Sequence, residues 1–270
     1  MRQWRLIYDH PSTGAYNMAV DEAILRAVSA DEQPPTLRLY GWDPFCISLG
    51  YGQSAADVDQ NRLSAQGWDL VRRPTGGRAI LHGDELTYSV ALPIGHEFAQ
   101  GDVISSYRRL STPLLAALKH LGLMPQSEPQ AAKTGRNRGA VCFEVPSHYE
   151  ITVQGRKLIG SAQVRRKAGI LQHGTLPLLG DVARICDVLV YDEEEARKMA
   201  RETVRERATT LSQALGRVVE WHSAAEAVVA GFETTFDLKL VSDELSLQER
   251  TIADELIESV YTRDSWNAKC

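Results

Sequence analysis

A change of pattern at Asp181 constrains the fold of this 270-residue chain more than any other feature. Strand-like segments dominate the first two-thirds, and helical segments follow from Asp181 onward. Strands outnumber the helices that could connect them as crossovers, which argues against a doubly wound parallel sheet. We therefore predict an α+β fold, a mixed β-sheet with helices packed around it. No linker-like stretch interrupts the chain, so we expect a single domain over 1–270 with a helical part at about 181–270.

Hydrophobic periodicity and turn residues place the individual elements. Predicted helices cover 13–30, 57–67, 102–121, 181–190, 192–207, 210–216, 222–236 and 244–261. Predicted strands cover 4–9, 36–42, 46–51, 69–74, 79–82 and 85–93, and a further run over 149–178. That run turns at Gln154-Gly155 and again near 167–169. Pro113 lies inside a predicted helix, so we expect a kink or a break there, and the polar segment 125–141 is predicted to be a mobile loop.

Composition and motifs exclude several classes of protein. Hydrophobic residues make up 43% and charged residues 24%, as in globular proteins with a substantial core. No apolar run approaches the roughly 18 residues of a membrane helix, and the start, MRQWRLIYDH, is strand-like rather than a signal peptide. The four cysteines lack CxxC spacing, so we expect a cytoplasmic protein with free thiols, in which Cys46 and Cys186 are buried. With no metal-ligand spacing, P-loop or GxGxxG, we expect no metal and no cofactor.

The net charge of −5 conceals an uneven distribution. Residues 133–167 hold eight basic and two acidic residues, a net charge of +6, whereas the last ninety residues carry −8. A basic segment on an acidic protein favours an acidic partner. The alternative is that these charges are merely solvated turn residues.

The first candidate site is the stretch VRRPTGGRAILHGDELTYSV, residues 71–90. Gly76 and Gly77 let a backbone approach a ligand closely, because neither has a Cβ. Basic residues surround the pair, and His82 lies on the outgoing strand. The alternative is a tight hairpin with solvated arginines, at Arg72, Arg73 and Arg78.

The second candidate is Cys142, which follows a strongly basic loop and precedes Pro146. A nearby cation lowers the pKa of a thiol from about 8.5 and makes it a nucleophile. If residues 149–160 form a hairpin, Lys157 lies on the return strand, from which its ammonium could reach a loop that enters the first strand. The alternative is that Lys157 faces solvent.

The third candidate is LIGSAQ, residues 158–163. Gly160, Ser161 and Ala162 are small residues within a predicted strand, which favours close packing against either an extended ligand or a crossing strand. His173, in LQHGTL, is more typical of a histidine at the edge of the core than of a catalytic one.

In combination and order, RRPTGGRAILH, VCFEVPSHYEI, GRKLIGSAQ and ILQHGTL resemble the lipoate–protein ligase and octanoyltransferase superfamily. Within it the chain is most similar to the LipM-type octanoyltransferases, over nearly its full length. The resemblance implies the biotin/lipoyl-ligase catalytic fold, which is class II synthetase-like. It also implies transfer of octanoyl from octanoyl-acyl carrier protein to a lysine of a lipoyl-accepting domain, typically the glycine cleavage H protein. We expect neither a nucleic-acid nor a membrane partner, and a monomer.

The resemblance also implies roles for individual residues. Cys142 matches the cysteine that carries the acyl thioester, and Lys157 matches the lysine that lowers the pKa of that cysteine. Arg73, Gly76, Gly77 and His82 match the loop that lines the acyl pocket. Gly160, Ser161 and Ala162 match its opposite wall.

Three alternatives remain open, and departures from neighbouring families bear on two of them. An ATP-dependent lipoate–protein ligase typically has a third glycine where this chain has Arg78, and lacks a cysteine at position 142. An amidotransferase of the same superfamily usually lacks the RRPTGGR loop. A non-catalytic acyl-binding protein is the third alternative, which an assay of thiol reactivity tests.

Overall fold

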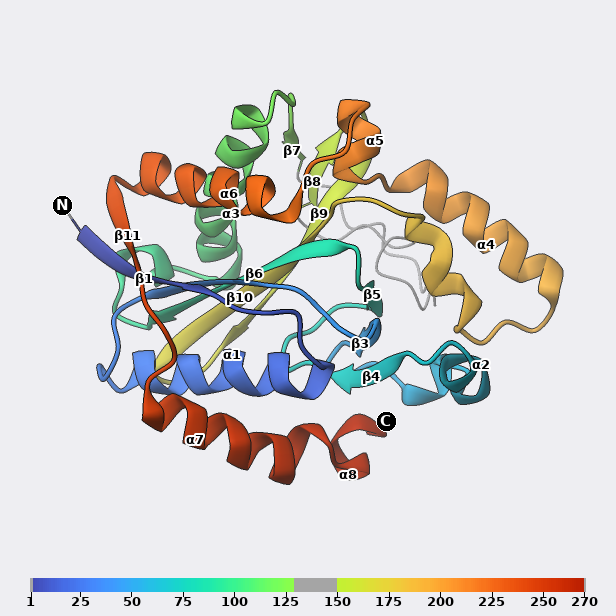
Figure 1. Ribbon diagram of the computed structural model, residues 1–270, viewed down its shortest axis with the longest axis horizontal. Helices are drawn as coiled ribbons and strands as arrows, with labels where there is room; N and C mark the ends of the chain where they lie inside the picture. Colours follow the sequence, from blue (N-terminus) through green and yellow to red (C-terminus); the bar gives the residue numbers. More distant parts are fainter. Residues whose placement is uncertain (1, 129–149, 270) are drawn as a thin grey trace.

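The computed structural model describes residues 2–128 and 150–269. Its main feature is a mixed sheet, in which the described part of the chain supplies eight strands in the order β11-β1-β2-β6-β10-β9-β8-β7 (Figure 1). Strand β1 pairs parallel with β11 and β2, and the other neighbours are antiparallel. The strands are β1 (Arg2–Tyr8), β2 (Thr36–Tyr40), β6 (Glu85–Pro93), β7 (Gln126–Glu128), β8 (Glu150–Val153), β9 (Arg156–Arg165), β10 (Gly169–Pro177) and β11 (Leu238–Ser242).

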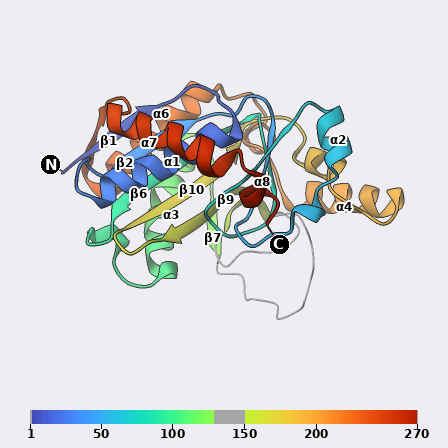
Figure 2. The same ribbon diagram turned by 90° about the horizontal axis from the view of Figure 1, so that it is seen from below.

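Helices cover both faces of this sheet. Figure 1 shows α1 (Gly14–Ser29) and α7 (Leu247–Leu256) on one face, and α3 (Val103–His120) and α6 (Trp221–Phe236) on the other. Seen from below, α7 lies along α1 (Figure 2). Thr13 caps α1 by accepting a hydrogen bond from the backbone N–H of Tyr16, and residues such as Met18 and Val28 bury its inner face.

A smaller sheet, with order β4-β3-β5, lies at one end of the main sheet (Figure 1). It consists of β3 (Cys46–Leu49), β4 (Asp69–Arg72) and β5 (Ile80–His82). Its apolar side chains share a core with α2 (Gln60–Ala65), α4 (Glu194–Arg207) and a 3₁₀ helix at Val182–Asp187. The short helices α5 (Leu211–Leu215) and α8 (Asp264–Asn267) complete the last third of the chain. The loop between β4 and β5 carries the glycine pair of the first candidate site.

The predicted α+β class, the helix at 13–30 and the hairpin at 149–160 are confirmed. Gln154 and Gly155 both have positive φ, 52° and 74°, as a tight hairpin turn requires. Of the kink or break expected at Pro113, the break is wrong, because α3 runs through this residue. Helix α6 packs so closely there that a Cβ on Gly231 would overlap the carbonyl oxygen of Pro113, and this packing supports the helix.

The helical description of 181–270 needs one correction. Residues Leu238–Ser242 form strand β11, which extends the main sheet beside β1. Within the predicted loop at 125–141, Gln126–Glu128 form strand β7, and 129–141 lie outside the described residues. Among the described helices, none combines the length and the apolar character that a bilayer-spanning segment needs.

Candidate functional site

All seven residues that the sequence predicted for the substrate pocket line one cavity. Arg73, Gly76 and Gly77 come from the β4–β5 loop, His82 from the end of β5, and 160–162 from β9. The cavity therefore lies where the small sheet meets the main sheet. Its other lining residues are Met18, Tyr40, Trp42, Ser48, Ile80, Thr87, His173, Gly174 and Thr175. Its volume is about 70 Å³.

Close backbone packing explains the small residues in its walls. A Cβ on Gly174 would lie 2.5 Å from both the carbonyl oxygen of Gly160 and the Oγ of Ser161. Gly77 has φ +101°, in the region that favours glycine. At the end of β3, a Cβ on Gly50 would overlap the carbonyl oxygen of Gly77. The glycine-pair loop is thus held against the small sheet.

Arg73 fixes the shape of the glycine-pair loop from within. Its side chain is buried, and Nη2 donates hydrogen bonds to the carbonyl oxygens of Gly76 at 2.9 Å and Arg78 at 2.8 Å. Nη1 donates to the carbonyl oxygen of Ser48 at 2.8 Å. Arg72 is also fully buried. A hairpin with solvated arginines is therefore wrong for both residues.

His82 lies in a chain of polar contacts along one wall of the cavity. Its Nε2 is 2.7 Å from Ser48 Oγ, and its Nδ1 is 2.6 Å from Glu85 Oε1. The Trp42 ring stacks on the imidazole with centroids 3.9 Å apart, and Trp42 Nε1 donates to Thr87 Oγ1 at 2.8 Å. A carboxylate at Nδ1 favours the tautomer with hydrogen on Nδ1, in which Nε2 accepts a hydrogen bond from Ser48 Oγ.

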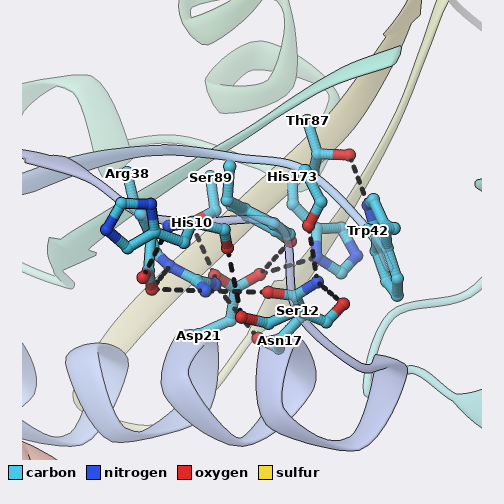
Figure 3. Close-up of polar contacts among 12 residues, drawn as sticks. His10, Ser12, Asn17, Asp21, Arg38, Trp42, Thr87, Ser89 and His173 are labelled. Carbon is cyan, nitrogen blue, oxygen red and sulfur yellow. Dashed lines mark hydrogen bonds and ion pairs between the residues drawn. The ribbon is translucent and has the colours of Figure 1, made fainter. Parts of the chain in front are cut away.

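A second buried network, centred on Asp21 of α1, reaches the cavity through His173 (Figure 3). Asp21 accepts hydrogen bonds from Arg38, Tyr40 and Ser89 at 2.9, 2.9 and 2.7 Å. Its Oδ2 lies 3.2 Å from His173 Nδ1. His173 Nε2 lies 2.7 Å from Thr75 Oγ1, in the glycine-pair loop.

Burial sets the ionisation of this network. Desolvation lowers the pKa of His173, although the Asp21 hydrogen bond and charge oppose that shift. Desolvation would raise the pKa of Asp21, but the His173 hydrogen bond and the Arg38 charge outweigh it and lower that pKa. The expectation of a histidine at the edge of the core missed this connection. One signal was available, because Asp21 falls on the apolar face of a predicted helix, between Met18 and Leu25.

Lys157 is buried, with 3% of its surface exposed, so the solvent-facing alternative is wrong. Its Nζ donates a hydrogen bond to Glu150 Oε1 at 2.7 Å, across the β8–β9 hairpin. A Cβ on Gly160 would lie 3.1 Å from Lys157 Cε, so the lysine side chain passes beside the small-residue wall of the cavity. Cys142 lies outside the described residues, and so does its predicted approach to Lys157.

Two further predictions concern the remaining cysteines and the basic segment. Cys46 and Cys186 are buried as predicted, and burial raises the pKa of the Cys46 thiol well above its usual value. Arg165, from the basic segment, is used within the fold, because it donates hydrogen bonds to the carbonyl oxygens of Ala99 at 2.5 Å and Gly101 at 3.0 Å.

Within the ranges that the structure covers, no group of three or more His, Cys, Asp or Glu residues is arranged to hold a metal ion.

Comparisons with known proteins place this geometry in a family context. Residues 13–233 match the family described as the lipoyl protein ligase A/B catalytic domain. The chain is 42% identical to the octanoyltransferase LipM of Kyrpidia tusciae over 274 residues, which cover 99% of both proteins. It is 41% identical to that of Carboxydothermus hydrogenoformans over 268 residues, 98% of both.

A solved structure has the same fold. It is that of a bipartite lipoate protein ligase and its E2 lipoyl domain from Thermoplasma acidophilum. The match has a TM-score of 0.83 at 25% identity, and covers 99% of this chain and 97% of the matched chain.

Proposed function

Since the chain belongs to the lipoyl protein ligase A/B catalytic family, and within it to the LipM octanoyltransferases, we propose that it makes octanoylated proteins for lipoate biosynthesis. The donor is octanoyl-acyl carrier protein, and the acceptor is a lysine of a lipoyl-domain protein such as the glycine cleavage H protein. The octanoyl group passes through a thioester on Cys142. The reaction takes place in the cytoplasm without a nucleotide, because the donor thioester is already activated.

The cavity is the observation that carries this proposal. Two segments about 80 residues apart in sequence, at 73–82 and 160–162, line one cavity whose walls combine glycines with aromatic and small polar side chains. Ser48, His82 and His173 in the lining form hydrogen bonds within the fold, which supports an acyl chain as the occupant.

The first half-reaction moves the acyl group to the enzyme. The Cys142 thiolate attacks the thioester carbonyl, a carbon–sulfur bond to the enzyme forms, and the bond to the donor sulfur breaks. Backbone N–H groups of Gly76 and Gly77 are our candidates for stabilising the oxyanion. One thioester replaces another, so this step is close to thermoneutral.

The second half-reaction forms the amide. The neutral amine of the acceptor lysine attacks the thioester on Cys142, the carbon–nitrogen bond forms, and the cysteine leaves as a thiolate. The amine loses a proton in this step. Lys157 stabilises the thiolate in both half-reactions through its positive charge, which the Glu150 carboxylate offsets in part.

Intact mass spectrometry tests this function. Incubation with octanoyl-acyl carrier protein should add one octanoyl group that hydroxylamine removes, and Cys142→Ala should lose that adduct. The buried Cys46 and Cys186 serve as internal controls, because they should stay unmodified in the folded protein. Acyl transfer that requires ATP, or an acyl adenylate formed from octanoate and ATP, would instead identify a ligase.

A further inference from the structure

The cavity at the junction of the two sheets, which we call the acyl cavity, crosses the main sheet from strand to strand. Four of its lining residues lie in one row of paired positions on β9, β10, β6 and β2: Gly160, Thr175, Thr87 and Tyr40. Residues that pair across a sheet share a face, so this row forms one side of the cavity. Neighbouring strands lie about 4.8 Å apart, so three strand spacings put Tyr40 about 14 Å from Gly160.

The two ends of this row differ in their chemistry. At one end, a Cβ on Gly160 would lie 3.1 Å from Lys157 Cε. Lys157 acts on the reacting sulfur in the function proposed above, so the thioester end of a bound acyl chain belongs at Gly160. The tail of the chain then extends along the row toward Tyr40.

Three buried side chains, Met18, Tyr40 and Trp42, line the cavity at the Tyr40 end and belong to one core cluster. Polar contacts fix the two rings. The Tyr40 hydroxyl donates to Asp21 at 2.9 Å, and Trp42 Nε1 donates to Thr87 Oγ1 at 2.8 Å (Figure 3). Met18 has an apolar, unbranched side chain, which is therefore the part of this end that packing alone positions.

Helix α1 holds Met18 against this end of the cavity. Met18 lies three residues before Asp21, so the two side chains lie on the same face of the helix. Gly14, one turn earlier, packs against the small sheet, where a Cβ would lie 2.5 Å from Cys46 Sγ. Atoms of the small sheet thus back the start of the helix. Shortening the Met18 side chain is therefore the direct way to lengthen the cavity at this end.

We propose that Met18 sets the length of acyl chain that the enzyme accepts, an inference that rests on the function proposed above. The terminal methyl group of the acyl chain meets the Met18 thioether, and the fixed rings of Tyr40 and Trp42 flank it. A longer chain overlaps Met18, and a shorter chain leaves an apolar gap. In a hydrophobic pocket, one methylene group changes the specificity ratio by about 10–200-fold.

The test uses the full-length enzyme and acyl carrier protein charged with hexanoyl, octanoyl or decanoyl groups. Acyl-enzyme formation is followed by intact mass spectrometry, and kcat/KM is obtained for each chain length. The variants are Met18→Ala, which removes the side chain beyond Cβ, the milder Met18→Val, and Met18→Phe, which fills more of the cavity. The matched control is Ile24→Ala, since Ile24 is equally buried on α1 in the same core cluster but does not line the cavity.

We expect Met18→Ala to raise the ratio of kcat/KM for decanoyl over octanoyl by about tenfold or more. Met18→Val should raise it less, and gives the same test if Met18→Ala is too unstable to purify. Met18→Phe should raise the ratio for hexanoyl over octanoyl. Ile24→Ala should keep the wild-type ratios although it also loses core packing.

Wild-type ratios in the Met18 variants would overturn the assignment, because the acyl tail would then end elsewhere. The same change of ratio in Ile24→Ala would also overturn it, since any loosening of α1 would then suffice. A wild-type enzyme that forms no acyl adduct with any donor would instead refute the proposed function itself.

Discussion

The buried Lys157–Glu150 pair should serve both stability and reactivity, and paired substitutions can separate the two. Lys157→Met leaves the Glu150 carboxylate buried without the ammonium that lies 2.7 Å away. Removing one partner of a buried ion pair typically costs about 3–5 kcal/mol. We therefore expect Lys157→Met to lower the free energy of unfolding by about that amount. The double variant Glu150→Gln/Lys157→Met carries neither charge, and should recover most of the loss.

The reactivity of Cys142 should follow the net charge of the Lys157–Glu150 pair and not the free energy of unfolding of each variant. Lys157→Met, alone or with Glu150→Gln, should move the midpoint of thiol alkylation to higher pH, because the lysine charge that favours the thiolate is removed. Glu150→Gln alone should move it lower, because the lysine charge is no longer offset. Two unit charges about 4 Å apart interact by about 4 kcal/mol at an intermediate dielectric, ample for a measurable shift.

Urea unfolding gives the stabilities, and alkylation of Cys142 followed by mass spectrometry across pH gives the midpoints. Cys142→Ala reports any background alkylation. The reasoning fails if Lys157→Met and wild type share one midpoint. It also fails if the stable double variant acylates as fast as wild type, since the lysine would then be purely structural.

Three further predictions concern the surroundings of the cavity. Burial lowers the pKa of His173 below its usual 6.5, so neutral His173 stabilises the fold above pH 6.5, and this contribution is lost as the pH falls. His173→Gln should therefore flatten the dependence of the unfolding free energy on pH below 6.5, by at most about 1.4 kcal/mol per pH unit. Arg72 donates to the carbonyl oxygens of Trp266, Asn267 and Lys269, so Arg72→Met should speed hydrogen exchange in 264–269 and destabilise the fold by about 3 kcal/mol; unaltered exchange there would contradict this. The methyl group of Gly50→Ala should push against Gly77, lower the free energy of unfolding by about 1–3 kcal/mol in thermal unfolding, and slow acyl-enzyme formation. A normal acylation rate would show that the loop tolerates the shift.

Local pattern was sufficient to predict much of the fold and part of the site. The helix at 13–30 follows from apolar spacing, and the hairpin at 149–160 follows from Gln154-Gly155. The small residues of the two cavity walls were visible as glycine-rich interruptions in strand patterns. Family resemblance, and not spacing, joined those two walls into one pocket. The residues themselves suggested Cys142 as a nucleophile with Lys157 near it, and the resemblance added the acyl-thioester role.

What local pattern missed depends on contacts between distant segments. Local pattern does not reveal strand β11, because five residues between helices gain strand structure only by pairing with β1 at the other end of the chain. The same holds for the cavity's polar groups, since Asp21 and His173 meet across 152 positions.

Charged residues were the hardest to interpret from sequence. Arg72 lies in a run of basic residues that looks solvated, yet its guanidinium is buried among carbonyl oxygens about 195 positions away. Lys157 looks like a hairpin lysine, and its burial depends on Glu150 and on packing beside Gly160. Periodicity records which face of an element avoids water, and so the sequence determined the elements and their buried faces. Contacts in the folded chain set which buried charge meets which partner, because a polar group can be buried only where the fold supplies its hydrogen bonds.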